Sequence, residues 1–120
     1  MKKAHISATI LLVEDEIHTA DSLNKQLTDT GYTVFIANTS EDAHLLITQQ
    51  NIQIILIDIQ AESKFDPFFV AEDILTQKHI PIIFLLSGND LKTIGKLQQI
   101  NSYGYVLKEN GIALMNLSIQ

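Results

Sequence analysis

The chain has 120 residues and a mass of 13.4 kDa, which is the size of one domain and enough to bury a hydrophobic core. Its net charge is −6 and its eight basic residues are scattered, so the sequence lacks the basic patch that nucleic-acid binding requires. It has no cysteine and no apolar run long enough to span a bilayer, and we expect a cytoplasmic protein with neither a membrane nor a direct nucleic-acid partner.

Short apolar runs rich in β-branched residues alternate with longer amphipathic stretches along the whole chain. Three of the runs are almost continuously apolar, which is typical of strands covered on both faces in a parallel sheet. The predicted strands are Ile10–Val13, Thr33–Ala37, Ile54–Ile57, Ile82–Leu86 and Tyr105–Leu107. The predicted helices are Ile17–Thr28, Glu41–Gln49, Phe68–Gln77, Leu91–Ile100 and Ile112–Ile119.

Local signals support the first two helices. The first has apolar residues at positions 17, 20, 23 and 27, and Gly31 stops it. Thr39 and Ser40 supply hydroxyl caps for the second. Five βα units in series predict a doubly wound α/β fold with helices on both faces of a five-stranded parallel sheet. We expect a single domain over residues 1–120, in which residues 1–8 form a flexible N-terminal segment.

Polar residues follow four of the predicted strands directly. Each of them alone is most often a solvated loop residue. In a parallel sheet, however, the carboxyl ends of the strands meet at one edge, where ligands bind. The sequence therefore predicts one site, made by five residues: Glu14, Asp15, Asp58, Ser87 and Lys108.

The acids of this set suit a hard divalent cation such as Mg²⁺, which prefers oxygen ligands and keeps several waters. Asp15 and Asp58 provide the negative charge, with Glu14 acting directly or through water. The backbone carbonyl of Gln60 is a further candidate ligand. Crowded carboxylates repel one another, so we expect at least one raised pKa without the cation.

Asp58 is the best candidate nucleophile because a carboxylate can form an acyl phosphate. The phosphoryl oxygens then need neutralisation, by the cation, by the Lys108 ammonium and by a hydrogen bond from the Ser87 hydroxyl. Gly88 leaves room for the donor and for attacking water.

The ordered motifs of the chain resemble the receiver domain of two-component response regulators and hybrid sensor kinases. The motifs are Ile10-Leu-Leu-Val-Glu-Asp-Glu16, Leu56-Ile-Asp-Ile59, Phe84-Leu-Leu-Ser-Gly88 and Tyr103-Gly-Tyr-Val-Leu-Lys108. The resemblance covers about Thr9 to Gln120, and the segment from Ile100 to Gly111 is most similar to receivers of multidomain sensory histidine kinases. It implies the flavodoxin-like (βα)5 fold with strand order 2-1-3-4-5.

The resemblance also implies phosphoryl transfer to Asp58 from the histidine of a sensor kinase or phosphotransfer protein, with Mg²⁺ and self-catalysed dephosphorylation. The domain would then be a signalling module rather than an enzyme. On phosphorylation Ser87 would move toward the phosphoryl group and Tyr105 would turn inward. That change would reshape the face formed by the fourth helix, fifth strand and fifth helix.

The chain departs from the family pattern in two loops. Glu109 follows Lys108 where many receivers have proline, and because a cis non-proline bond costs about 3 kcal/mol we predict a trans Lys108–Glu109 bond. The loop from Gln60 to Pro67 has no glycine, and we expect an atypical or mobile conformation. Phenylalanines in and after this loop need cover: Phe65, Phe68 and Phe69.

Two alternative functions remain open. One is a pseudo-receiver that binds partners without phosphorylation, and the other is a small Mg²⁺-dependent phosphohydrolase. The second lacks an acid two residues past Asp58, where Gln60 stands.

The uncharged last helix indicates either a homodimer or intramolecular interface, or a helix that continues into a following segment. The four histidines show no ligand spacing.

Overall fold

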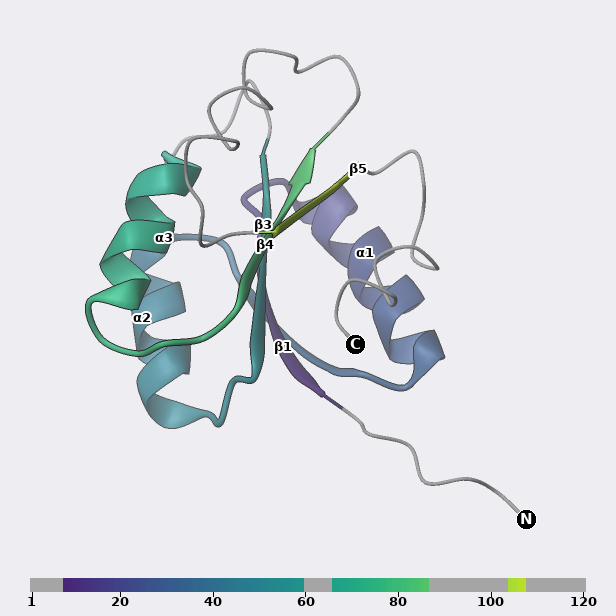
Figure 1. Cartoon of the computed structure of the whole chain (residues 1–120). Coiled ribbons are helices and arrows are strands. Elements are labelled where there is room, and N and C mark those ends of the chain that lie inside the picture. The colour runs from purple at the N-terminus through teal and green to yellow at the C-terminus, as the bar shows by residue number, and fades with distance from the viewer. Residues whose placement is uncertain (1–7, 60–65, 87–103, 108–120) are drawn as a thin grey trace.

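A computed structural model of the chain describes residues 8–59 and 66–86, and residues 104–107 by their backbone (Figure 1). The five strands form one parallel sheet in the order β2-β1-β3-β4-β5, which confirms the predicted topology. The strands are β1 Thr9–Val13, β2 Thr33–Ala37, β3 Ile54–Asp58, β4 Ile82–Leu86 and β5 Gly104–Leu107. The helices are α1 Ile17–Thr30, α2 Ser40–Gln49 and α3 Pro67–Leu75. The predicted helices Leu91–Ile100 and Ile112–Ile119 lie outside the described residues, as does most of the expected N-terminal segment.

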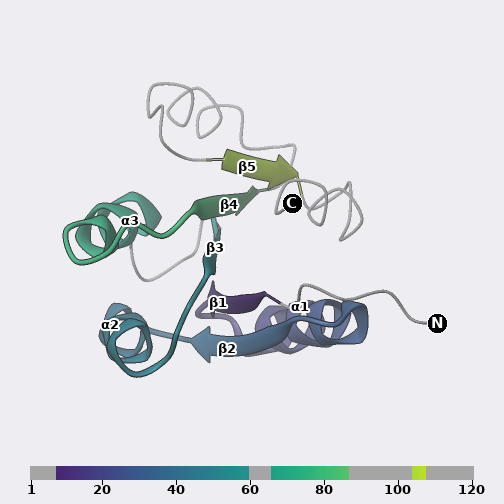
Figure 2. The ribbon, with the colours of Figure 1, turned by 60° about the horizontal axis from the view of Figure 1, so that its bottom comes forward.

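The sheet is covered by helices on both faces. Figures 1 and 2 both show α2 and α3 on one face and α1 on the other. Alternate residues of β1 enter different cores: Leu11 and Val13 pack in the cluster under α2 and α3, whereas Ile10 and Leu12 pack in the cluster under α1. Because both faces are buried, the strand reads as a continuous apolar run.

The ends of α1 and α2 follow from their capping residues. Gly31 ends α1 in a left-handed conformation with φ +114°, and its N–H donates to Thr28 O at 3.0 Å. The helix therefore runs two residues beyond the predicted end at Thr28. At the start of α2, Thr39 Oγ1 accepts a hydrogen bond from Asp42 N at 3.1 Å, so the helix begins at Ser40, one residue before the prediction.

The third helix begins earlier and ends earlier than predicted. Asp66 caps it by accepting a hydrogen bond from Phe68 N at 2.9 Å, and Pro67 occupies the first turn, where its missing N–H costs nothing. The backbone tightens after Leu75, with Gln77 N donating to Ile74 O at 2.9 Å, which ends the regular helix. Asp66 and Pro67 are the described part of the loop expected to be atypical.

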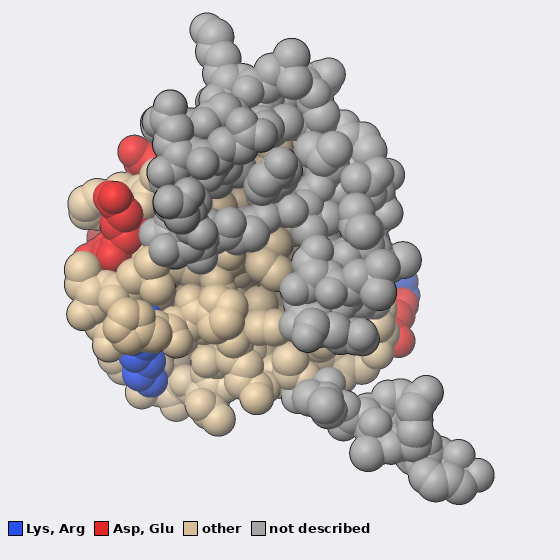
Figure 3. Space-filling model, viewed as in Figure 1, with Lys and Arg blue, Asp and Glu red and all other residues tan. Residues whose placement is uncertain are grey.

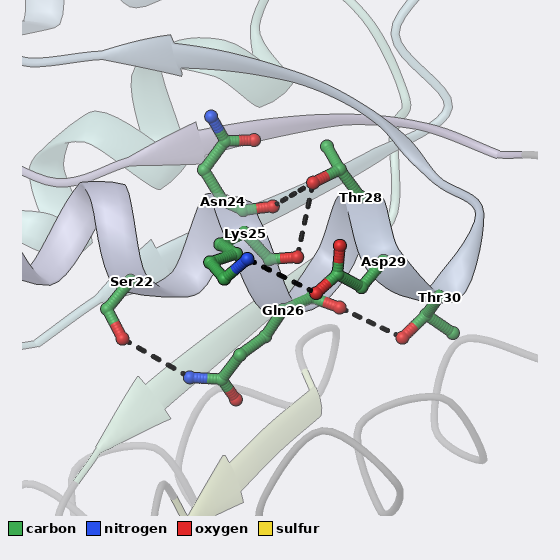
Figure 4. A network of polar contacts seen from close by, with 7 residues as sticks. All are labelled: Ser22, Asn24, Lys25, Gln26, Thr28, Asp29 and Thr30. Carbon is green, nitrogen blue, oxygen red and sulfur yellow. Dashed lines mark hydrogen bonds and ion pairs between the residues drawn. The ribbon is translucent and has the colours of Figure 1, made fainter.

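The exposed side of α1 carries polar contacts between residues three or four positions apart (Figure 4). The Lys25 ammonium lies 3.9 Å from the Asp29 carboxylate, and the Gln26 amide donates to the Ser22 hydroxyl at 3.3 Å. Such pairs stabilise a helix by a few tenths of a kcal/mol each.

Within the described ranges, no helix is both long and apolar enough to cross a membrane.

A polar cluster joins α2 to α3. The His44 imidazole contacts the Asp73 carboxylate through Nε2, and the Gln77 amide nitrogen contacts Nδ1. Both contacts are satisfied when Nε2 carries the proton and Nδ1 accepts. The Lys78 ammonium also donates to Ile47 O at 3.1 Å. These contacts tie α2 to α3 and to the turn that follows α3, on one face of the sheet.

Candidate functional site

The strand register places Glu14 and Asp58 side by side at the carboxyl edge of the sheet. Val13, the last residue of β1, pairs with Ile57 of β3. The next residues along the two strands, Glu14 and Asp58, therefore lie at the same level of the sheet. Neighbouring strands of a sheet lie about 4.8 Å apart. The edge of the sheet therefore brings two of the predicted acids together.

Asp58 is the last residue of β3 rather than the first residue after it, which corrects the predicted strand end at Ile57. The reason is that the pairing with β4 continues one residue further. Asp58 is level with Leu85, and Ile59 N donates to Leu85 O at 2.8 Å. The sheet thus fixes the backbone on both sides of the Asp58 carboxylate.

Both carboxylates are buried. Glu14 and Asp58 are each 1% exposed, and they are the only charged residues among the buried ones in the described part of the chain. Burying an ionised carboxylate is costly unless a hydrogen bond or an opposite charge compensates it. Two level, buried acids therefore concentrate negative charge at this edge of the sheet, which a bound cation would offset.

Hydrogen bonds fix the Glu14 backbone and one of its carboxylate oxygens. Glu14 N donates to Ala37 O at 2.9 Å, and the Asn38 amide donates to Glu14 O at 2.9 Å. Glu14 Oε2 accepts a hydrogen bond from Glu16 N, also at 2.9 Å. The end of β2 and the turn after β1 together determine where this acid stands.

Glu16 caps α1, a role that the sequence reasoning missed. Its Oε1 accepts hydrogen bonds from Thr19 N and Thr19 Oγ1, both at 2.8 Å, and its Oε2 accepts one from His18 N at 3.3 Å. The bonds from Thr19 are the main cause of a lowered pKa for the Glu16 carboxyl. The signal in the sequence was an acid directly before the first apolar residue of a predicted helix.

The donors at this edge suit a hard cation, although the described residues include no group of three or more His, Cys, Asp or Glu side chains that could hold a metal. Glu14 and Asp58 are buried, and Asp15, the residue after Glu14, is half-buried. The side-chain atoms that these three residues offer to a metal ion are all carboxylate oxygens. Mg²⁺ commonly uses only one or two carboxylates and keeps several waters, so the residues present fit it.

The other predicted site residues lie at or beyond the limits of the described chain. Tyr105 lies in β5, where its backbone is level with Phe84. Outside the described residues are Gln60, Ser87, Gly88, Lys108 and the Lys108–Glu109 peptide bond. Leu86 and Leu107, after which Ser87 and Lys108 follow in sequence, pair with each other at the carboxyl edge.

The phenylalanines after the loop have different surroundings. Phe68 packs against Phe84 and the core under α3, which confirms the expected cover. Phe69 is 62% exposed, so the described residues do not supply the cover that we expected it to need. Phe65 lies outside the described residues.

On the described surface seen in Figure 3, lysine atoms do not gather into a patch.

The strand order and the acidic carboxyl edge define a flavodoxin-like α/β domain of the receiver type. The family described as response regulator receiver domain matches residues 10–120, and the chain belongs to this family. It is thus a signalling domain of two-component systems.

Curated relatives are longer regulators. The chain is 30% identical over 99 residues to the probable transcriptional regulator ycf27 of Cyanidium caldarium. The matched segment covers 82% of this chain and 39% of the relative. It is also 30% identical over 81 residues to the aerobic respiration control protein ArcA of Escherichia coli K12, covering 68% of this chain and 33% of ArcA. The chain therefore spans less than half the length of these relatives.

Solved structures share the fold. The N-terminal domain of a response regulator/sensory box/GGDEF three-domain protein from Carboxydothermus hydrogenoformans superposes with a TM-score of 0.75 and 28% identity, covering 92% of this chain and 93% of that one. A response regulator receiver domain protein from Clostridium thermocellum gives a TM-score of 0.78 at 20% identity, covering 93% and 90%. The second likeness concerns the fold alone.

Proposed function

We propose that the domain is a phosphoacceptor switch in which Asp58 receives a phosphoryl group from the histidine of a sensor kinase or phosphotransfer protein. The observation that carries the proposal is the buried Asp58 carboxylate, level with the buried Glu14 at the carboxyl edge of a receiver fold. Family membership adds the expected donor. Residues 1–120 would form a single receiver domain, acting in the cytoplasm.

In the transfer step, an Asp58 carboxylate oxygen forms the new bond to phosphorus while the phosphorus–nitrogen bond to the donor imidazole breaks. The imidazole leaves with a proton, and Asp58 becomes an acyl phosphate. Burial helps because a carboxylate stripped of water is a stronger nucleophile and the product is shielded from hydrolysis. β3 and β4 hold the backbone of this residue by the pairing described above.

Glu14, Asp15, Asp58 and the Gln60 carbonyl would hold Mg²⁺, with waters completing the octahedron. When bound, Mg²⁺ supplies positive charge for the phosphoryl oxygens. It also offsets the repulsion between the acids. Glu14, held by Glu16 N and Asn38, keeps its place at the edge without the cation.

Ser87 and Lys108 would complete the neutralisation, by a hydroxyl hydrogen bond and an ammonium charge. The pairing of Leu86 with Leu107 supports this assignment, because it brings the ends of β4 and β5 to the same edge as Asp58. Gly88 would leave space for the donor. Tyr105, in β5, would transmit the state of Ser87 to the face used by the output, which includes a homodimer contact through the last helix.

The test is phosphorylation by acetyl phosphate or phosphoramidate with MgCl₂, followed by intact mass spectrometry. We expect an adduct of one phosphoryl group on the wild type, none on Asp58→Asn, and none in EDTA. Asp21→Asn is the matched control, since it removes an exposed aspartate of α1, and it should keep the adduct. An adduct that persists on Asp58→Asn would overturn the assignment of Asp58. Failure with both donors would favour a pseudo-receiver, and steady turnover of phosphate monoesters a hydrolase.

A further inference from the structure

The turn after β1 contains a third acid, Glu16, that the proposed phosphoacceptor chemistry does not use. Glu16 is exposed, yet both of its carboxylate oxygens accept hydrogen bonds, from His18 N, Thr19 N and Thr19 Oγ1. An exposed glutamate side chain normally samples several rotamers in water. Here three donors from the first turn of α1 hold the side chain in one place.

The Glu16 backbone links this cap to the acidic edge. Its N–H donates to Glu14 Oε2 at 2.9 Å. The hydrogen bonds therefore run in series from the first turn of α1, through the side chain and backbone of Glu16, to the buried carboxylate of Glu14. On the other side, the Asn38 amide holds Glu14 O. Asp15 stands between the two acids, so its backbone is fixed at both ends.

We propose that Glu16 is a positioning residue: by capping α1 it fixes the turn that places the Glu14 and Asp15 carboxylates, and so it sets the divalent-cation affinity of the edge. This inference rests on the proposed function, because it assumes that the edge binds a cation. Partners that orient metal-binding carboxylates typically change metal affinity by 10- to 100-fold when removed.

The competing explanation is that Glu16 stabilises only the helix. Glutamate is not among the preferred N-cap residues, which are Ser, Thr, Asp and Asn. A short cap would satisfy one or two N–H groups. The longer Glu16 side chain reaches two N–H groups and the Thr19 hydroxyl, while the Glu16 backbone N–H donates to Glu14. The combination favours a role beyond capping.

The experiment compares the dissociation constant of Mn²⁺, measured by water-proton relaxation, with urea stability on the same full-chain samples. Glu16→Ala should weaken Mn²⁺ binding by about tenfold. Gly31→Ala is the matched control, since it strains the opposite end of α1, where Gly31 has φ +114° and its N–H donates to Thr28 O at 3.0 Å. It should lower stability by a similar amount and leave the Mn²⁺ constant within about twofold of the wild type.

Two further variants separate position from charge. Glu16→Gln removes the charge but keeps a carbonyl oxygen that can accept from Thr19, and it should retain most of the affinity. Thr19→Val leaves every charge in place but removes the hydroxyl that donates to Glu16 Oε1, and it should weaken binding in the same direction as Glu16→Ala.

The outcomes distinguish the positioning role of Glu16 from the cation site itself. Equal Mn²⁺ constants for the wild type and Glu16→Ala would overturn the positioning role while leaving the cation site intact. Equal losses in Glu16→Ala and Glu16→Gln, with none in Thr19→Val, would assign the effect to charge and also overturn it. A wild type that binds no Mn²⁺ would instead contradict the proposed function itself.

Discussion

The ring of Phe68 in α3 packs against the ring of Phe84 in β4, with centroids 5.3 Å apart and ring planes tilted by 40°. Phe84 is completely buried in the middle of the sheet, level with Ile57 of β3. The contact joins α3 to β4, the strand that pairs with β3 and its Asp58. It therefore fixes α3, the helix that follows β3 in sequence.

Replacing Phe68 by alanine should lower the free energy of unfolding by about 2 kcal/mol, less than the loss for a fully buried phenylalanine because the ring is half-buried. Phe69→Ala is the matched control, since Phe69 is the next residue of the same helix and is mostly exposed. It should change stability by at most about 0.5 kcal/mol. Urea unfolding followed by circular dichroism measures both, and equal losses would contradict the packing role of Phe68.

The sheet was predictable because its strands carry a strong local signal. β2 and β4 begin and end at the predicted residues, because each is a short run rich in apolar and β-branched residues that ends at a polar residue, Asn38 or Ser87. The position of Asp58 within β3 was not predictable, because it depends on pairing with β4, more than 20 residues away in sequence. Register between distant segments is a tertiary property.

The site was predictable only to the level of its acids. Strand ends placed Glu14 and Asp58 at one edge, and the register makes them level. The contacts that hold Glu14 were not visible in the sequence, because they come from the Glu16 backbone and from Asn38 at the end of β2. Nor was the His44–Asp73 contact, whose partners lie on separate helices.

The backbone at Gly31 has φ +114°, a conformation that other residues rarely adopt. A Cβ added there would meet no atom within 4 Å, so the penalty for alanine is conformational rather than steric contact with neighbours. Gly31→Ala should lower stability by about 1 kcal/mol. Gly31→Asn should cost less, because asparagine tolerates positive φ better. Thermal unfolding of the three proteins tests this, and an unchanged midpoint for Gly31→Ala would contradict it.

The His44–Asp73 contact joins α2 to α3 at a partly exposed position. Pairs of this kind contribute up to about 1 kcal/mol. His44→Ala and Asp73→Ala should each lower stability, and the double variant should lose less than the sum of the two. His79→Ala, at an exposed histidine, should have no effect beyond about 0.5 kcal/mol. Additive losses in the cycle would show that the two side chains do not interact in solution.

The lowered pKa of Glu16 predicts the pH dependence of its contribution to stability. Hydrogen bonds from Thr19 and His18 favour the ionised carboxylate in the folded state, so its folded pKa lies below the unfolded value. The stabilisation is then fully present above the unfolded pKa and is lost as the pH falls through the folded pKa. Urea midpoints in EDTA should favour the wild type over Glu16→Gln at pH 7, and the two midpoints should converge at low pH. A difference that does not change with pH would contradict this.

The two level, buried acids predict opposite effects of Asp58→Asn without and with Mg²⁺. In EDTA the substitution removes one of two neighbouring buried charges, so the thermal midpoint should rise above that of the wild type. Mg²⁺ binds only the folded state, so adding it should stabilise the wild type as its concentration exceeds the dissociation constant. The same addition should change Asp58→Asn little, because a ligand charge is gone, while Asp21→Asn should follow the wild type. A lower midpoint for Asp58→Asn in EDTA would show that repulsion between the two acids does not limit the stability of the folded domain without the cation.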